Sequence, residues 1–170
     1  GIVAVASPNA DETQNGSVVF FDTNGTFLKQ VTVGALPDMV VFSADGTKVM
    51  TANEGQPNAD YSIDPEGSVS IIDISGGIAS LQQTDVTTLL FTNYNANETS
   101  LIASGVRKLK VTSTMSQDFE PEYITISSDS QKAWVTLQEN NAIAEINLVT
   151  KTISEVWALG TKDVSIPGNG

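Results

Sequence analysis

The 170-residue sequence contains no cysteine and no histidine, and it has few basic side chains. Without cysteine there is no disulfide, no catalytic thiolate and no thiolate-ligated zinc. Without histidine, the Ser-His-Asp and Cys-His catalytic arrangements and the usual zinc ligand sets are also excluded. Any chemistry of this chain must therefore use carboxylates, hydroxyls, amides and a few Lys or Arg side chains.

The charge balance is strongly acidic, with 20 Asp and Glu residues against 8 Lys and Arg residues and a formal net charge of −12. Proteins bind nucleic acid through clustered Lys and Arg, so this composition argues against a nucleic-acid partner. An acidic chain instead attracts cations or basic partners. No apolar run approaches the ~20 residues that a membrane helix needs, so we expect no transmembrane segment. No signal-peptide pattern opens the chain.

The sequence does contain a long internal repeat. Pro37–Lys48 returns as Pro121–Lys132, and twelve successive positions match in kind. The shared order is a proline, an acid, an apolar run, a serine, a turn and a lysine. A strand–turn–strand unit that recurs in this way indicates a repeat architecture.

Short β-branched runs bounded by Gly, Asn, Asp and Pro fill most of the chain, and helical periodicity is almost absent. A polar and irregular insertion is expected at Phe91–Asp118, with one strand-like piece at Arg107–Val111. The expected strands are Ile2–Ala6, Gly16–Asp22, Phe27–Val33, Val40–Phe42, Lys48–Ala52, Gly67–Asp73, a segment near Leu81–Leu89, Tyr123–Ile126, Ala133–Leu137, Ala142–Asn147 and Thr152–Leu159.

Tandem units of four antiparallel strands are typical of β-propeller blades. We therefore expect an all-β fold, an arc of about three blades. It divides into a partial blade at 1–36, a second blade with a long acidic loop at 37–90, the insertion at 91–120 and a third blade at 121–170. A propeller closes with at least about four blades, so we expect this chain to be a fragment of a larger one. A β-sandwich or meander sheet is the alternative.

Six further segments in order along the chain carry a family resemblance. They are Leu36–Val40, Ala52–Gly55, Asp64–Asp73, Glu120–Ile124, Ala133–Asn141 and Leu159–Asp163, which leads to Pro167–Gly170. They are similar to the bacterial choice-of-anchor I family of secreted propellers, and Val33–Gly46 resembles the YVTN-type (lactonase-like) propeller repeat. The resemblance implies a seven-bladed propeller at the cell surface, extracellular or periplasmic. Some members carry an alkaline-phosphatase or phytase-like label, but no catalytic motif can be carried over.

Most acidic residues fall in the loops that lie on one face of a propeller, usually the binding face. Asp38 and Glu122 occupy equivalent positions in the repeat, near the expected central channel. A ring of carboxylates suits Ca²⁺ or another divalent cation, because Ca²⁺ takes about 6–8 oxygen ligands. Solvated surface acids are the alternative. The candidate metal ligands are Asp38, Glu54, Asp60, Asp64, Glu66, Glu120, Glu122 and Glu139.

Three functions remain open. The first is a secreted or cell-surface binding or scaffold module, whose acidic face binds a divalent cation, a small ligand or a basic partner and whose other partners are the remaining blades. The second is a metal-dependent phosphoric-ester hydrolase, in which the ion would activate water. It ranks second because phosphate binding also needs positive charge, and this chain supplies little. The third is a purely structural propeller that spaces other domains.

Overall fold

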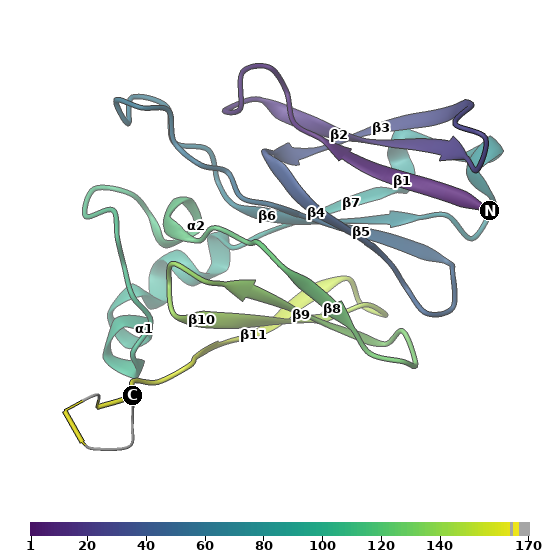
Figure 1. The fold of residues 1–170 in the computed structure, drawn as a ribbon. Helices are drawn as coiled ribbons and strands as arrows, with labels where there is room; N and C mark the ends of the chain where they lie inside the picture. Colours follow the sequence, from purple (N-terminus) through teal and green to yellow (C-terminus); the bar gives the residue numbers. More distant parts are fainter. Residues whose placement is uncertain (164, 167–170) are drawn as a thin grey trace.

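The computed structural model describes residues 1–163, 165 and 166, which form three antiparallel sheets of three, four and four strands (Figure 1). The first sheet holds β1 (Ile2–Ser7), β2 (Asn15–Asp22) and β3 (Phe27–Ala35). The second sheet holds β4 (Pro37–Phe42), β5 (Lys48–Asn53), β6 (Ser68–Asp73) and β7 (Val86–Leu90). The third sheet holds β8 (Ile124–Ile126), β9 (Lys132–Leu137), β10 (Ala142–Asn147) and β11 (Thr152–Ala158).

Within each sheet, strands that follow one another in the chain also pair side by side. The order is β1-β2-β3 in the first sheet, β4-β5-β6-β7 in the second and β11-β10-β9-β8 in the third. This up-and-down order, repeated in tandem, is the order within propeller blades. The all-β expectation of about three blades is confirmed. The Pro167–Gly170 motif lies outside the described residues.

The repeated sequence makes the same turn twice. In the second sheet, the Ser43 hydroxyl donates to the Asp45 carboxylate over 2.6 Å, and the Lys48 N–H donates to the Ser43 hydroxyl over 2.9 Å. In the third sheet, the Ser127 hydroxyl donates to Asp129, also over 2.6 Å. Ser and Asp side chains that bond nearby backbone in this way favour tight turns. The repeat therefore encodes the β4–β5 and β8–β9 turns directly.

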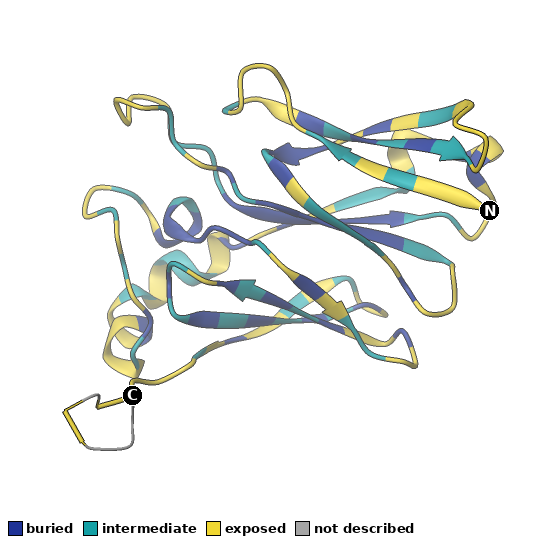
Figure 2. Cartoon of the chain, in the orientation of Figure 1, coloured by how far each residue is buried: buried dark blue, intermediate teal, exposed yellow. Residues whose placement is uncertain are grey.

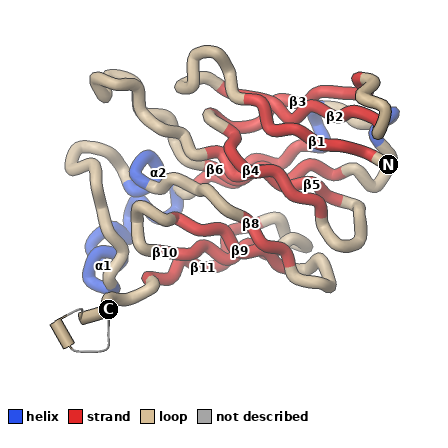
Figure 3. The backbone as a smooth tube through the Cα atoms, viewed as in Figure 1, coloured by secondary structure: helices blue, strands red, loops and turns tan. Residues whose placement is uncertain are grey.

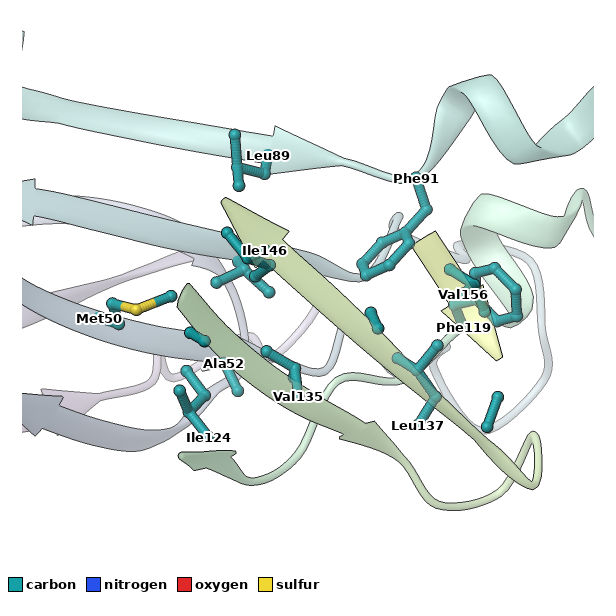
Figure 4. Close-up of a cluster of buried hydrophobic side chains, with 14 of the residues drawn as sticks. Met50, Ala52, Leu89, Phe91, Phe119, Ile124, Val135, Leu137, Ile146 and Val156 are labelled. Carbon is teal, nitrogen blue, oxygen red and sulfur yellow. The ribbon is translucent and has the colours of Figure 1, made fainter. Parts of the chain in front are cut away.

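Two apolar cores separate the three sheets, and the second sheet contributes to both. Val49 and Ile72 pack with the first sheet, whereas Met50 and Ile71 pack with the third sheet. Neighbouring residues of a strand point to opposite faces, so adjacent apolar residues fill opposite cores. Figure 4 shows the larger core between the second and third sheets, and Figure 2 shows that the two central strands of the second sheet, β5 and β6, are almost entirely buried.

The expected insertion is helical rather than irregular. It contains the 3₁₀ helix η3 (Thr92–Asn97) and the α-helices α1 (Glu98–Ser104) and α2 (Met115–Asp118) (Figure 3). Each element is too short to show a helical period in the sequence. In α1, for example, Leu101 is the one buried residue. None of the described helices is long and apolar enough to cross a membrane.

One strand prediction is wrong, and another begins too early. Arg107–Val111 is not a strand, because its backbone N–H groups donate to Asn140 and Asp118 instead of a neighbouring strand. The fourth strand of the second sheet begins at Val86 rather than near Leu81. The 3₁₀ helices η1 (Ile78–Ser80) and η2 (Gln83–Asp85) occupy the residues before it.

Candidate binding face

The loops that carry most acidic residues emerge at one end of the three sheets. These are the loops at 8–14, 54–67 and 138–141, together with the insertion, and Figure 1 shows all of them on the left. The β2–β3, β4–β5, β6–β7, β8–β9 and β10–β11 connections lie at the opposite end. This is the distribution that the order of strands in the repeat predicts.

Five carboxylates form a cluster on this face, which we call the acidic rim: Asp38, Glu54, Glu120, Glu122 and Glu139. Asp38 lies at the start of β4, and Glu54 directly follows β5. Glu120 and Glu122 precede β8, and Glu139 lies between β9 and β10. Burial, and then the charges of Asp38 and the three other rim carboxylates, raises the pKa of Glu54 to about 7. The rim is therefore strongly electronegative.

Two other rim carboxylates, Glu122 and Glu120, also have raised pKa values. Burial, followed by the charge of Glu139, raises the pKa of Glu122. Burial also raises the pKa of Glu120, although Lys110 opposes this by hydrogen bonding and by charge. Glu139 Oε2 is buried without a hydrogen-bond donor among the described residues, and the neighbouring Glu122 carboxyl shares a hydrogen bond with Glu139 that helps to raise the pKa of Glu122. An oxygen of this kind is costly to leave unsatisfied, which favours a ligand or water at the rim.

The backbone holds two rim residues from adjoining strands in register. Glu54 N–H donates to the Leu36 carbonyl over 2.9 Å, and Gly55 N–H donates to the Ala35 carbonyl over 3.2 Å. Leu36 has a φ of 49°, which is unusual for a side chain of this size. Strained residues often lie at functional sites. The strained turn leads directly into Pro37 and so orients the start of β4, where Asp38 lies.

A fully buried amide supports the rim from behind. The Asn140 side chain donates to Asp118 Oδ2 over 2.8 Å and to the Arg107 carbonyl over 3.1 Å. The Asp118 carboxylate in turn accepts from the backbone N–H of Lys110 over 2.6 Å. Asn140 and Asp118 are both fully buried. These bonds fasten the insertion to the turn that carries Glu139, and neither residue was among the candidate ligands.

Asp60 lies away from the rim. It is exposed, and it accepts from the Ser62 hydroxyl over 2.7 Å and from the Ser62 N–H over 3.2 Å. These hydrogen bonds hold the pKa of Asp60 below its usual range. Its carboxylate thus stabilises its own loop.

Asp64 and Glu66 connect the long loop to the insertion. Lys110 Nζ lies 3.3 Å from Asp64 Oδ1 and 3.1 Å from Glu120 Oε1. The Ser116 hydroxyl donates to Glu66 Oε1 over 2.7 Å. Sequence analysis did not foresee these contacts, because the partners lie far apart in the chain. The partners of Asp64 and Glu66 are therefore Lys110 and Ser116 of the insertion, and neither acid is part of the rim.

The rim is electronegative without being a finished metal site. In the part of the chain that the structure describes, no three acidic side chains are placed to hold one metal ion. A Ca²⁺ ion would therefore need rim side chains to move toward it, or oxygens from elsewhere. A basic side chain of a partner could bind the rim without the close coordination geometry that a metal ion requires.

Three tandem antiparallel sheets, facing one another across two cores and carrying their long loops at one end, define an arc of a β-propeller. The chain belongs to the family described as the choice-of-anchor I domain, whose pattern matches residues 1–169. Membership makes it a surface-associated propeller module. No curated protein matches the chain.

Several solved structures are similar to this chain. Hydrazine synthase of Kuenenia stuttgartiensis matches with a TM-score of 0.53 and 11% identity, over 86% of this chain and 37% of that one. The β-propeller domain of the trilobed protease from Pyrococcus furiosus matches with a TM-score of 0.48 and 11% identity, over 92% of this chain and 38% of that one. A chain of a nidogen/laminin complex matches with a TM-score of 0.48 and 12% identity, over 93% of this chain and 43% of that one. The chain spans less than half the length of each, and at these identities the likeness concerns the fold alone.

Proposed function

We propose that this chain belongs to an extracellular or cell-surface propeller that binds a positively charged ligand at the acidic rim, with Ca²⁺ as the first candidate. The observation that carries this proposal is the gathering of five carboxylates at the rim, where burial and the surrounding charges raise the pKa of Glu54 to about 7. A bound cation would relieve that repulsion. The buried Glu139 oxygen, which has no hydrogen-bond donor among the described residues, supports the same reading.

Proton and cation should compete at the rim. When Glu54 is protonated, the rim carries less negative charge and attracts a cation less strongly. Cation affinity should therefore rise as the pH passes upward through about 7. A ligand that ignored the rim would show no such dependence.

The test is calorimetric titration of the full-length protein with CaCl₂ at about pH 8 and about pH 5, with thermal unfolding in parallel. We expect saturable binding that is stronger at the higher pH and weakened by Glu54→Gln or Glu122→Gln. Asp60→Asn is the matched control, because Asp60 bonds within its own loop. A Lys-rich peptide serves as the second probe. Failure of both probes to bind would leave the propeller as a scaffold.

A phosphoric-ester hydrolase is the second candidate, and one observation favours it. A carboxylate that titrates near neutral pH suits general acid–base catalysis, and Glu54 has such a pKa. Against it, Lys110 lies between Asp64 and Glu120 and is largely neutralised by them. A phosphate-ester assay in the calcium titration separates the two: turnover lost in Glu54→Gln would favour the hydrolase.

A further inference from the structure

A concave surface lies on the outside of the arc and includes none of the rim carboxylates. It is a cavity of about 560 Å³ between β7, η3 and β11, which we call the outer groove. The outer strands of two neighbouring sheets form its walls, and the insertion closes one side. Its volume is in the range of small-molecule sites. Its lining includes the polar and aromatic side chains of Asn93, Tyr94, Asn97, Lys151, Ser154 and Glu155.

The groove presents amides and hydroxyls that the chain itself does not use. Among the described residues, the side chains of Asn93, Asn97 and Ser154 form no hydrogen bond with the chain. All three are exposed. Amides both donate and accept, and a hydroxyl does the same. Such a lining can pair with a ligand that carries many hydroxyls.

Charge in the groove is balanced. Lys151 and Glu155 are the charged side chains that line it, so it favours neither an anion nor a cation. This differs from the acidic rim. The balance points to an uncharged polar ligand.

An aromatic ring forms part of the wall and is held in place. The ring of Tyr94 lies 6.3 Å from that of Phe91 and 6.5 Å from that of Phe119, measured between centroids. Burial, and then the charge of Glu155, raises the pKa of Tyr94. Tyr94 therefore stays neutral and offers an apolar ring together with a hydroxyl donor, which is the amphipathic surface that suits the C–H and O–H groups of a sugar.

A β-bulge in β11 argues against an extended peptide as the occupant. Glu145 pairs with Glu155 and Ile146 pairs with Ile153, so Ser154 is the extra residue. Bulges and charged side chains are the devices that stop an edge strand from pairing with another chain. Bulges also re-aim a side chain near functional sites. Here the bulge falls on Ser154, which lines the groove.

We propose that the outer groove binds a neutral saccharide, with hydrogen bonds to Asn93, Asn97, Ser154 and Glu155 and with the sugar ring against Tyr94. The proposal does not depend on the acidic rim, because none of these residues belongs to it. A propeller at a cell surface would thereby hold a glycan on its outer edge while the rim faces a different ligand.

The test is calorimetry of the full-length protein, in the presence of a calcium chelator, with cellohexaose, chitohexaose, maltohexaose and mannohexaose. We expect at least one to bind, and Asn97→Ala or Glu155→Ala to weaken it about tenfold, as the loss of a hydrogen bond does. Tyr94→Phe keeps the ring contacts and removes only the hydroxyl. Asn24→Ala, on an exposed turn elsewhere, is the matched control and should bind normally.

Two results would overturn the proposal: that none of the four saccharides binds, or that the groove variants bind as well as the Asn24→Ala control. Binding of an uncharged extended peptide, with no saccharide competing, would assign the groove to strand addition instead. Glu54→Gln should leave saccharide binding unchanged, so failure of the calcium proposal and failure of this one can be told apart.

Discussion

Glu54 should make the stability of the protein depend on pH in a direction that is unusual for an acid. The unfolded chain releases its proton near 4.5, whereas the folded chain keeps it until about pH 7. The folded state binds more protons between these values, so stability falls as the pH rises through this window and is level above it.

Replacing Glu54 by Gln should remove this loss. We expect Glu54→Gln to unfold at a higher temperature than the parent at about pH 8, and at the same temperature at about pH 4. Because the side chain is half-buried, solvent screening limits the gain to about 1 kcal/mol. Differential scanning calorimetry at both pH values measures it, with the exposed Glu12→Gln as control. An equal gain at both values would contradict the assignment.

Asn140 should be among the costliest single positions to truncate. Asn140→Ala removes the donor to Asp118 and leaves that buried carboxylate with fewer partners. Removing one partner of a buried, charged hydrogen bond costs about 2–4 kcal/mol. Urea unfolding checks the loss, with the exposed neighbour Gln138→Ala as control. Loss of less than half this amount would mean that Asp118 finds other partners.

At the scale of single residues, the sequence predicts contacts between residues that are close in the chain and misses contacts between residues that are far apart in it. The β4–β5 and β8–β9 turns were readable because Ser, Asp and Lys recur at fixed spacing, and even the left-handed residue recurs, as Gly46 with φ 69° and Ser130 with φ 56°. The pairing of Lys110 with Asp64 was not readable. Those residues lie 46 positions apart, and no local pattern marks such a contact.

At the scale of elements, Gly67 holds the insertion against the second sheet. A Cβ added at Gly67 would collide with the Phe119 carbonyl oxygen and the Pro121 ring. Its N–H also donates to the Ser116 carbonyl over 3.1 Å. Backbone must move to admit even a methyl group here, because a carbonyl cannot rotate out of the way as a side chain can.

We therefore expect Gly67→Ala to destabilise the protein by about 2–4 kcal/mol, as overpacking and backbone shifts do. Gly76→Ala is the matched control, because its nearest neighbour is the flexible Ser80 hydroxyl. Thermal unfolding compares the two variants. A neutral Gly67→Ala would show that the insertion is not packed as closely as the structure places it.

The helices of the insertion show why element type was harder to predict than element order. Each is brief, and α1 ends where Gly105 takes a φ of 105°. The packing of the insertion rests on aromatic contacts between Phe91, Tyr94 and Phe119, which come from both of its ends. Burial of such a segment depends on the sheets around it, and a short window of sequence does not contain that information.

At the scale of the whole molecule, the arc has exposed apolar side chains on each outer side. On the first sheet Val3, Val5 and Phe27 are 44%, 42% and 58% exposed, and on the third sheet Trp157 is 45% exposed next to Ile143. Apolar sheet faces of this kind normally pack against another layer. They fit further propeller blades on both sides.

Residues 1–170 produced alone should consequently self-associate. We expect sedimentation velocity to show concentration-dependent oligomers, which Val5→Lys reduces and Asn24→Lys, on an exposed turn, does not. In the full-length protein Val5→Lys should instead lower the unfolding temperature, because the face is then covered. A strictly monomeric fragment would count against blades on both sides.

The second sheet packs on two sides at once, and this shapes how the protein can change over generations. A substitution in β5 or β6 alters one core or the other, depending on which of two neighbouring residues it strikes. Where further blades cover their outer faces, the first and third sheets meet the same constraint. Among relatives of this chain, the buried positions of β5 and β6 should therefore drift more slowly than the exposed turns that join the strands.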